Sequence, residues 1–240
     1  VENGRCKVMK KSLLLILIAV LNGVIVYSNE LAECITTGNI EKAKQIIASD
    51  KNISKKEIED ILEGAIEQGN NELAKFILEN KKITIRKERA IFAALGNENH
   101  NYQNYNMEMI KYLLTNCKET IKERRYYDST TSLMIAVKTG NMEIVKLFIE
   151  NGAELNLKNW NGETALSYAI EKEAVDIVKY LIKSGASLKN IDRYGYTYLM
   201  ASKNEEISQE LLKNGAEVDF SGIRIVLEPE CMANTKTVAE

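Results

Sequence analysis

The sequence has a single proline, Pro229, and a single histidine, His100, in 240 residues. The near absence of proline and the abundance of Lys, Glu and Ile favour helices over a β architecture punctuated by proline. His100 lies in an asparagine-rich stretch without a carboxylate or cysteine pattern around it, so the sequence indicates neither a metal site nor a nucleophilic triad. We therefore expect a protein that is not an enzyme and that needs no metal and no cofactor.

Signals for binding phosphate or nucleic acid are lacking as well. The formal net charge is −2, and Lys and Glu are interspersed along the chain, which argues against a nucleic-acid partner. The turn at Asn161 and Gly162 lacks a glycine-rich phosphate cradle with its lysine. Glu171 and Glu173 fall in a turn between predicted helices, where solvation accounts for both. The sequence thus predicts no small-molecule substrate.

The N-terminal region has the layout of a secretory signal peptide. Two lysines after Met9 precede an apolar run at residues 13–26, which is short for a membrane span. We predict a signal peptide at residues 9–28, cleaved after Ser28, and a periplasmic or extracellular protein; residues 1–8 are interpreted as an upstream artefact. The alternative is an uncleaved signal anchor, in which residues 13–26 tether the chain to a membrane.

Cysteine is scarce too. After the predicted cleavage the chain keeps Cys34, Cys117 and Cys231, an odd number at wide spacing, which excludes a disulfide framework and a CxxC redox or zinc motif. We interpret all three as small buried or tolerated side chains. Cys34 in particular falls at the small-residue core position that Ala136 and Ala169 occupy in the repeats described next.

What the sequence does contain is an internal repeat. The stretch NGETALSYAI around Thr164 has altered copies that place Thr131 33 residues earlier and Thr197 33 residues later. An apolar stripe follows each copy, as at residues 177–182, and predicts a second helix. A glycine then ends this helix, because glycine adopts the left-handed conformation without steric cost. These glycines are Gly152, Gly185 and Gly215.

This pattern resembles the ankyrin repeat. The predicted units are three diverged ones at residues 29–54, 55–85 and 86–125, and three clear ones at 126–158, 159–191 and 192–219. The resemblance implies an all-α solenoid in which each unit holds two helices and a hairpin finger, and the first helices line a concave face. Residues 220–240 fall outside the frame and are predicted to be an irregular tail. With its signal segment, the chain is similar to exported bacterial ankyrin-repeat proteins.

The chain departs from the family pattern at several positions. The family's proline after the threonine is replaced by Ser132, Ala165 and Tyr198, which lowers the expected rigidity. The last unit is shorter than the others between Ser202 and Ile207. The diverged units lack the glycine that ends the second helix, so we expect them to be less stable. The residues found there are Asp50, Lys81 and Cys117.

Solenoid repeats leave an extended surface whose residues are not needed for packing between the repeats. In the family these free positions lie on the fingers and at the ends of the first helices. On the fingers, the predicted partner-binding residues are Tyr127, Asp128, Trp160, Asn161, Glu163, Arg193, Tyr194 and Tyr196. The other residues at such positions are Thr130, Lys138, Thr139, Glu171, Lys172, Asn204 and Glu205. Trp, Tyr and Arg are frequent anchors of protein interfaces.

We therefore expect a non-catalytic protein–protein interaction module that is exported and holds an unidentified partner protein on its concave face. A membrane would be a partner only if the signal segment is retained, and the alternative function is a tethered structural or spacer array. Should Trp160 and Tyr194 not contact the partner, the insert at residues 97–106 with Tyr102 and Tyr105 is the next candidate surface.

Overall fold

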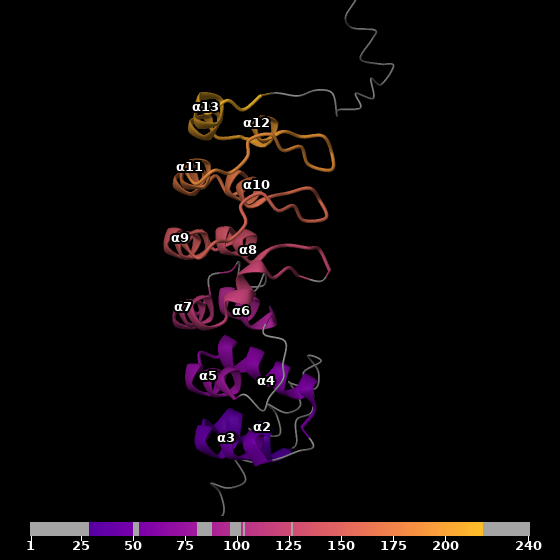
Figure 1. Ribbon diagram of the computed structural model, residues 1–240, viewed down its shortest axis with the longest axis vertical. Coiled ribbons are helices and arrows are strands. Elements are labelled where there is room, and N and C mark those ends of the chain that lie inside the picture. The colour runs from indigo at the N-terminus through magenta and orange to yellow at the C-terminus, as the bar shows by residue number, and fades with distance from the viewer. Residues whose placement is uncertain are drawn as a thin grey trace, which may run out of the picture. The chain divides into compact units, whose positions relative to one another are not determined.

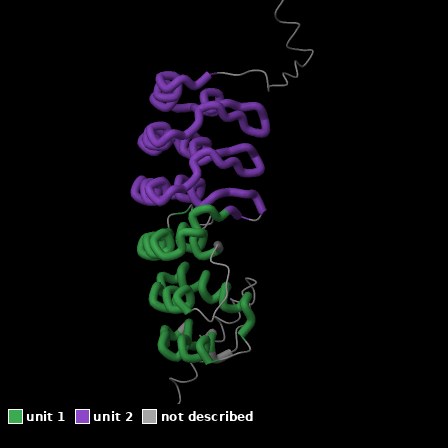
Figure 2. Tube along the Cα trace, viewed as in Figure 1, with its two compact units in different colours: residues 1–123 green, residues 124–240 purple. Residues whose placement is uncertain are grey.

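The computed structural model of this chain describes residues 29–49, 53–80, 88–96, 102, 104–125 and 127–217. Their regular structure is helical, as predicted, and no strand occurs among these residues; isolated bridges pair Arg124 with Thr131 and Ile191 with Thr197. The chain divides into two compact units, residues 1–123 and 124–240 (Figure 2). The predicted signal peptide, the upstream residues 1–8, Cys231, His100 and the tail at 220–240 lie outside the described residues.

Unit 1 contains successive pairs of helices (Figure 1). They are α2 (Asn29–Thr37), α3 (Ile40–Ser49), α4 (Lys55–Glu67), α5 (Asn71–Glu79), α6 (Glu88–Leu95) and α7 (Met107–Asn116), followed by the 3₁₀ turn η2 (Lys118–Lys122). Helix α4 packs against α5 and α6, and α6 packs against α7. Cys34 and Cys117 are buried free thiols, which confirms the interpretation of these two residues.

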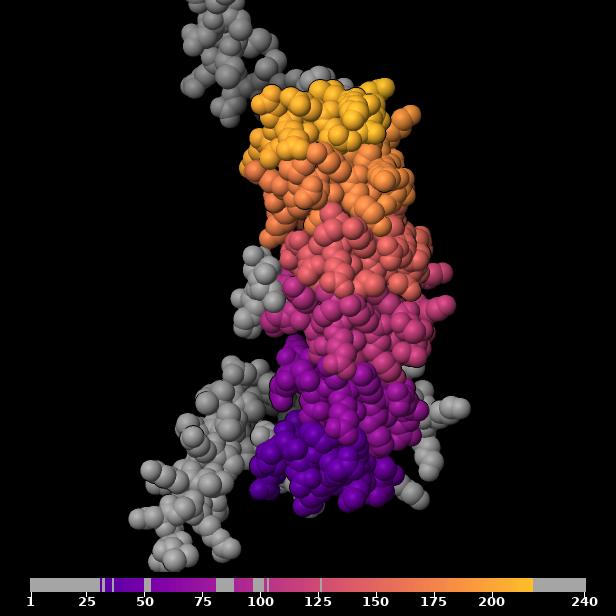
Figure 3. All heavy atoms as spheres, turned by 90° about the vertical axis from the view of Figure 1, so that its left-hand side faces the viewer, coloured from indigo at the N-terminus to yellow at the C-terminus, as the bar shows by residue number. Residues whose placement is uncertain are grey.

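Unit 2 contains the helices of the clearest repeats. They are α8 (Ser132–Lys138), α9 (Met142–Glu150), α10 (Ala165–Glu171), α11 (Val175–Lys183), α12 (Tyr198–Ala201) and α13 (Glu205–Lys213). Helix α10 contacts α8 and α12 in one layer, and α11 contacts α9 and α13 in a second layer. Long loops project from the first layer on the side away from the second (Figure 1). Viewed from the second layer, the side chains of α9, α11 and α13 pack without a break (Figure 3).

Burial in unit 2 follows the predicted apolar faces. Leu133 and Leu166 are 1% exposed, and Ala136 and Ala169 are fully buried where neighbouring first helices approach one another. In the second layer Ile177, Val178 and Leu181 are buried, while Asp176 and Lys179 of the same helix are exposed. Because α10 is covered by α8 on one side and by α12 on the other, the repeats of this unit share one continuous core.

The evenly spaced threonines begin the first helices of unit 2. The side-chain oxygens of Thr131, Thr164 and Thr197 accept hydrogen bonds from the backbone N–H three residues later, at 3.2, 3.3 and 3.4 Å. Each threonine thereby caps a helix whose first N–H groups have no partner in the helix itself. Asparagine has the same function at the second helices α5, α7, α9 and α13. Ala174 precedes α11 and provides no side-chain cap.

Glycines end the second helices of unit 2. Gly152, Gly185 and Gly215 have φ of 89°, 98° and 86°, in the left-handed region. The residue after each glycine donates its N–H back to the last turn of the helix, which satisfies a terminal carbonyl. In unit 1 Cys117 has φ −132° and leads into η2, so the helix ends there without a left-handed residue. Asp50 and Lys81 lie outside the described residues.

Helix α12 has four residues, whereas α8 and α10 have seven each. The shortening corrects two predicted positions, since Asn204 and Glu205 do not end a first helix. Asn204 caps α13 through its side chain, and Glu205 is the first residue of α13. The last repeat is therefore shorter in its first helix and in the turn that follows this helix.

No helix among the described residues has the length and apolar character needed to cross a membrane. In the insert of unit 1, Tyr102 is 4% exposed and therefore unsuited as an anchor for a partner, which corrects the expectation for this residue. Tyr105 is half-buried.

Candidate functional site

Three fingers extend from unit 2, at residues 124–131, 157–164 and 190–197, with residue 126 outside the described part. In two of them, one side-chain oxygen accepts two hydrogen bonds from its own turn. Asn159 Oδ1 accepts from the N–H groups of Asn161 and Glu163 at 2.9 and 3.0 Å. Asp192 Oδ1 accepts from Tyr194 and Tyr196 at 2.8 and 2.9 Å. Such bonds hold a turn in one conformation without help from a strand.

Backbone hydrogen bonds join each finger to the next. The N–H of Trp160 donates to the carbonyl of Asp128 at 3.0 Å, and the N–H of Arg193 donates to the carbonyl of Asn161 at 2.9 Å. Gly162 lies so close to the following finger that a Cβ atom there would be 3.1 Å from the Cα of Asp192. The fingers are therefore mutually supported, and their tips are ordered by main-chain contacts.

Large aromatic side chains project from these ordered tips. Tyr127 and Tyr194 are each 62% exposed, Trp160 is 66% exposed and Tyr196 is 51% exposed. We call these four residues the finger surface. An arginine lies over each of two rings: Arg125 is 4.9 Å from the centre of Tyr127 and Arg193 is 4.7 Å from the centre of Tyr194.

The predicted polar site residues of the fingers stabilise the fingers themselves. Asp128 pairs with Arg125 at 2.9 Å and accepts from the N–H of Thr130 at 2.8 Å. Glu163 Oε2 accepts from Asn159 at 2.7 Å and from the phenol of Tyr168 at 3.1 Å. These carboxylates are engaged inside the protein, so they have fewer free lone pairs for a partner than the sequence pattern suggested.

Asn161 and Arg193 link two fingers through their side chains as well. Arg193 Nη1 donates to Asn161 Oδ1 at 2.7 Å, and Arg193 Nη2 donates to the phenol oxygen of Tyr194, also at 2.7 Å. Both contacts are exposed, and Arg193 itself remains on the surface. This guanidinium therefore positions Tyr194 while one face of the finger tip stays accessible.

The other predicted residues, Thr130 on the first finger and four at the ends of the first helices, differ among themselves. Thr130 and Thr139 are buried, at 0% and 4% exposure, and belong to the core. Lys138 lies 4.3 Å from the centre of the Tyr168 ring, across from the next repeat. Of these five residues, only Glu171 and Lys172 are exposed.

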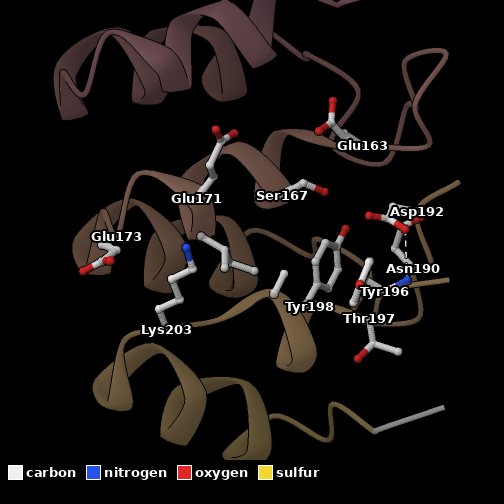
Figure 4. Close-up of a pocket in the computed structure, with 12 residues that line it drawn as sticks. Glu163, Ser167, Glu171, Glu173, Asn190, Asp192, Tyr196, Thr197, Tyr198 and Lys203 are labelled. Carbon is white, nitrogen blue, oxygen red and sulfur yellow. Dashed lines mark hydrogen bonds between the residues drawn. The ribbon is translucent and has the colours of Figure 1, made fainter. Parts of the chain in front are cut away.

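A pocket of about 280 Å³ opens between the last two repeats of unit 2 (Figure 4). We call it the inter-repeat pocket. Its polar lining residues are Glu163, Ser167, Glu171, Glu173, Asn190, Asp192, Tyr196, Thr197, Tyr198 and Lys203. Figure 4 shows Glu171, Glu173 and Lys203 at one end, Glu163 and Asp192 at the finger end, and the Tyr198 ring between the two ends. The pocket thus continues from the finger surface along the first helices.

Two buried phenols support this region. Tyr198 is 4% exposed and its hydroxyl lies 2.6 Å from that of Thr164. Burial raises the pKa of Tyr198, and burial together with the carboxylate of Glu163 raises the pKa of Tyr168. Because both phenols stay protonated at neutral pH, each keeps a hydrogen-bonding O–H group, and Tyr168 donates to Glu163.

The sequence pattern did not indicate the pocket residues Ser167, Asn190, Tyr198 and Lys203 as a site. One signal was present, since Tyr198 stands where the repeat pattern has proline. Among the described residues, no group of three or more His, Cys, Asp or Glu side chains could hold a metal ion. The carboxylates of the pocket are therefore spread along its length instead of converging on one point.

Comparisons with known proteins agree with this architecture. A family profile described as "Ankyrin repeats (3 copies)" matches residues 100–192 and 133–221. Among solved structures, the chain is similar to the ankyrin repeat domain of Bcl-3, a unique member of the IkappaB protein family. The TM-score is 0.64 at 18% identity, and the similarity covers 82% of this chain and 90% of that chain. No curated protein sequence matches this chain significantly.

Proposed function

This chain belongs to the ankyrin repeat family, and on that premise we propose that it is an exported protein–protein interaction module without catalytic activity. Ankyrin repeats generally mediate contacts between proteins, and the fold is typically a non-enzymatic interaction module. The partner is a protein that lies against the finger surface and the adjoining first helices of unit 2, on the face that is concave in the family.

The observation that carries this proposal is the exposure of four large aromatic residues on fingers whose main chains are fixed. Tyr127, Trp160, Tyr194 and Tyr196 are each more than half exposed. Tyr and Trp bury a large area at a low cost in side-chain entropy, which is why they are enriched at the energetic centres of interfaces. A monomer gains nothing from leaving four such rings in water on neighbouring loops.

Export is proposed from the signal segment at residues 9–28. We propose that the mature protein starts at Asn29 and acts in the bacterial periplasm or at the cell surface. Mass spectrometry of the intact purified protein decides between this proposal and tethering: an N-terminus at Asn29 supports release, whereas a retained Met9 supports a membrane anchor at residues 13–26.

Site-specific photo-crosslinking tests the binding surface. The photoreactive residue p-benzoylphenylalanine replaces Trp160 in one variant and Tyr194 in another. Leu212 is the matched control, because it is a large apolar residue that is 57% exposed but lies on α13 in the second layer. Crosslinking is carried out in cells, and the product is identified by mass spectrometry.

A single protein attached at Trp160 and Tyr194 but absent at Leu212 supports the proposal. The identified protein is then purified, and its affinity for the unmodified chain is measured. Crosslinks to the same protein at Leu212 alone would place the interface on the second layer and overturn the assignment of the face. Crosslinks from none of the three positions would contradict a protein-binding function for unit 2.

A further inference from the structure

We propose that the inter-repeat pocket accepts an arginine side chain of the partner protein. The inference rests on the proposed function, because it names the chemistry by which one part of the same surface recognises that partner. It follows from the charge of the pocket, an unsatisfied acceptor in its wall, and the aromatic surface beside it.

The charge of the pocket is negative. Four carboxylates line it, from Glu163, Glu171, Glu173 and Asp192, against one cation, Lys203. Glu171 and Glu173 are exposed, and the side-chain carboxylate of neither forms an ion pair or a hydrogen bond with a described residue, so these carboxylate oxygens are free for a ligand. An anion is disfavoured here, and because the carboxylates do not group around a metal position, the fitting ligand is an extended organic cation.

The wall of the pocket contains an acceptor without a donor. Asn190 is 5% exposed, and its side-chain nitrogen donates to the carbonyl of Gly162 at 3.0 Å. Its Oδ1 is buried and has no hydrogen-bond partner. Leaving such an acceptor unpaired costs free energy. A hydrogen-bond donor that reaches it from the pocket would remove this cost. A guanidinium supplies five N–H donors in one plane and can reach more than one acceptor at once.

Aromatic surface distinguishes arginine from lysine. Tyr196 is 51% exposed at the finger end of the pocket and provides its open aromatic surface, whereas the Tyr198 ring in the middle (Figure 4) is only 4% exposed. A guanidinium stacks on an aromatic face and sheds its water more readily than an ammonium group does. Guanidinium groups already lie over aromatic rings on the fingers, where Arg125 and Arg193 cover Tyr127 and Tyr194.

The contribution of the Glu173 carboxylate to cation binding can be tested with one substitution. It has φ of 54° in the turn between α10 and α11, a left-handed conformation that Gly140 holds at 69° in the preceding repeat. Glycine adopts this conformation with less strain than glutamate does. Glu173→Gly should therefore raise the melting temperature and at the same time weaken the binding of a cation, so the two effects have opposite signs.

The experiment is an NMR titration of the intact chain, labelled with ¹⁵N, with N-acetyl-arginine methylamide as the probe. We expect saturable shifts at the amides of Asn190, Tyr196 and Tyr198. N-acetyl-citrulline methylamide has nearly the same shape without the charge, and it should produce no saturable shift. N-acetyl-lysine methylamide should bind at least about threefold more weakly.

Variants assign the binding to the pocket. Glu173→Gly and Glu171→Gln should each weaken binding of the arginine probe by about threefold or more, whereas Lys203→Ala, which removes the one cation, should strengthen it by about twofold. Glu150→Gln is the matched control, because Glu150 is an exposed carboxylate at the end of α9 in the second layer, and it should leave the affinity unchanged.

Several results would overturn the inference: no saturable shift with the arginine probe, equal binding of the lysine or citrulline probe, or equal loss of affinity in Glu150→Gln. Other results distinguish a failure of this inference from a failure of the proposed function. A partner crosslinked at Trp160 and bound equally well by Glu173→Gly would refute the arginine pocket and leave the interaction surface intact. Binding of the arginine probe without any crosslinked protein would support the pocket and contradict the proposed function.

Discussion

The main chain of Trp160 is tied to the preceding finger, since its N–H donates to the carbonyl of Asp128 at 3.0 Å, while its indole is left in water. Arg193 repeats the relationship one finger later with Asn161. Such fingers are ordered before a partner arrives. A partner would therefore gain the contact area of the rings without first fixing the loops that carry them.

Binding and stability should separate at the finger surface. In the double variant Trp160→Ala with Tyr194→Ala, the backbone bonds between fingers remain, and no core side chain is removed. Truncating an interface anchor commonly costs about 2 kcal/mol or more of binding free energy, roughly a thirtyfold loss of affinity. We expect this loss for the crosslinked partner, with a change in the free energy of unfolding below about 0.5 kcal/mol for each substitution.

Leu212→Ala controls for the loss of exposed apolar area, because it lies on the second layer and should change neither quantity appreciably. Affinity is measured by calorimetry and stability by urea unfolding. Undiminished affinity of the double variant would move the interface off the fingers. An unfolded double variant would show that the two rings stabilise the repeat itself.

The regular parts of the fold could be predicted because their causes are local in sequence. A capping threonine such as Thr164 and a left-handed glycine such as Gly185 act on the helix next to them, so their spacing marks the repeat. Asn204 was assigned to the wrong element, because a shortened repeat shifts the alignment of the residues after it without any local signal in the sequence. The family, which the sequence pattern indicated, follows from the same periodic positions.

The inter-repeat pocket could not be predicted in the same way. It combines Glu173, in the turn between the two helices of one repeat, with Asn190 and Tyr198 of the following finger and helix, and only stacking brings them together. In the sequence, Glu171 and Glu173 are simply a solvated pair. The burial of Tyr102 was likewise hidden, because an aromatic residue in a polar insert gives no sign of which way it points. The predicted partner contacts stay predictions until the crosslinking is done.

Hydrogen exchange should show uneven stability among the repeats. Gly152, Gly185 and Gly215 end their helices in the left-handed conformation, whereas Asn80 after α5 and Cys117 after α7 do not. Repeat proteins can open one unit at a time, so less well capped repeats exchange sooner. We expect the amides around Ile144 and Ile177 to be protected longer than those around Ile46 and Leu73.

Mass spectrometry of peptic fragments after exchange for increasing times gives this profile for the intact protein. Cys117→Gly offers a check on the cause: if the missing cap limits protection, it should slow exchange in α7. Equal protection of the helices in both units would show that the caps do not determine local stability here.

A charge at Ala169 should disrupt unit 2. Ala169 is fully buried in α10, which contacts both α8 and α12, so the carboxylate of Ala169→Asp would have neither water nor a cation. We expect a loss of about 3 kcal/mol or more in the free energy of unfolding. Circular dichroism should show a lower melting temperature, with α10 to α13 lost together. Lys172→Asp, at an exposed position just after the same helix, is the control, and an unchanged transition in Ala169→Asp would refute the assigned register.

The uncapped start of α11 offers the opposite test, a gain in stability. Asn141 and Asn204 cap α9 and α13 by accepting backbone N–H groups at 2.8 to 3.3 Å, whereas Ala174 at the corresponding position accepts none through its side chain. Ala174 has φ −82° and is only half-buried, so an asparagine side chain has room to turn toward the N–H of Ile177. A capping side chain in place of alanine typically contributes about 1 kcal/mol, and Ala174→Asn should therefore raise the midpoint of urea unfolding without changing its slope.

Asn141→Ala is the mirror experiment and should lower the midpoint by a similar amount. If Asn141→Ala lowers stability while Ala174→Asn does not raise it, the turn that contains the left-handed Glu173 holds position 174 away from the capping geometry, and combining Ala174→Asn with Glu173→Gly should then recover the gain.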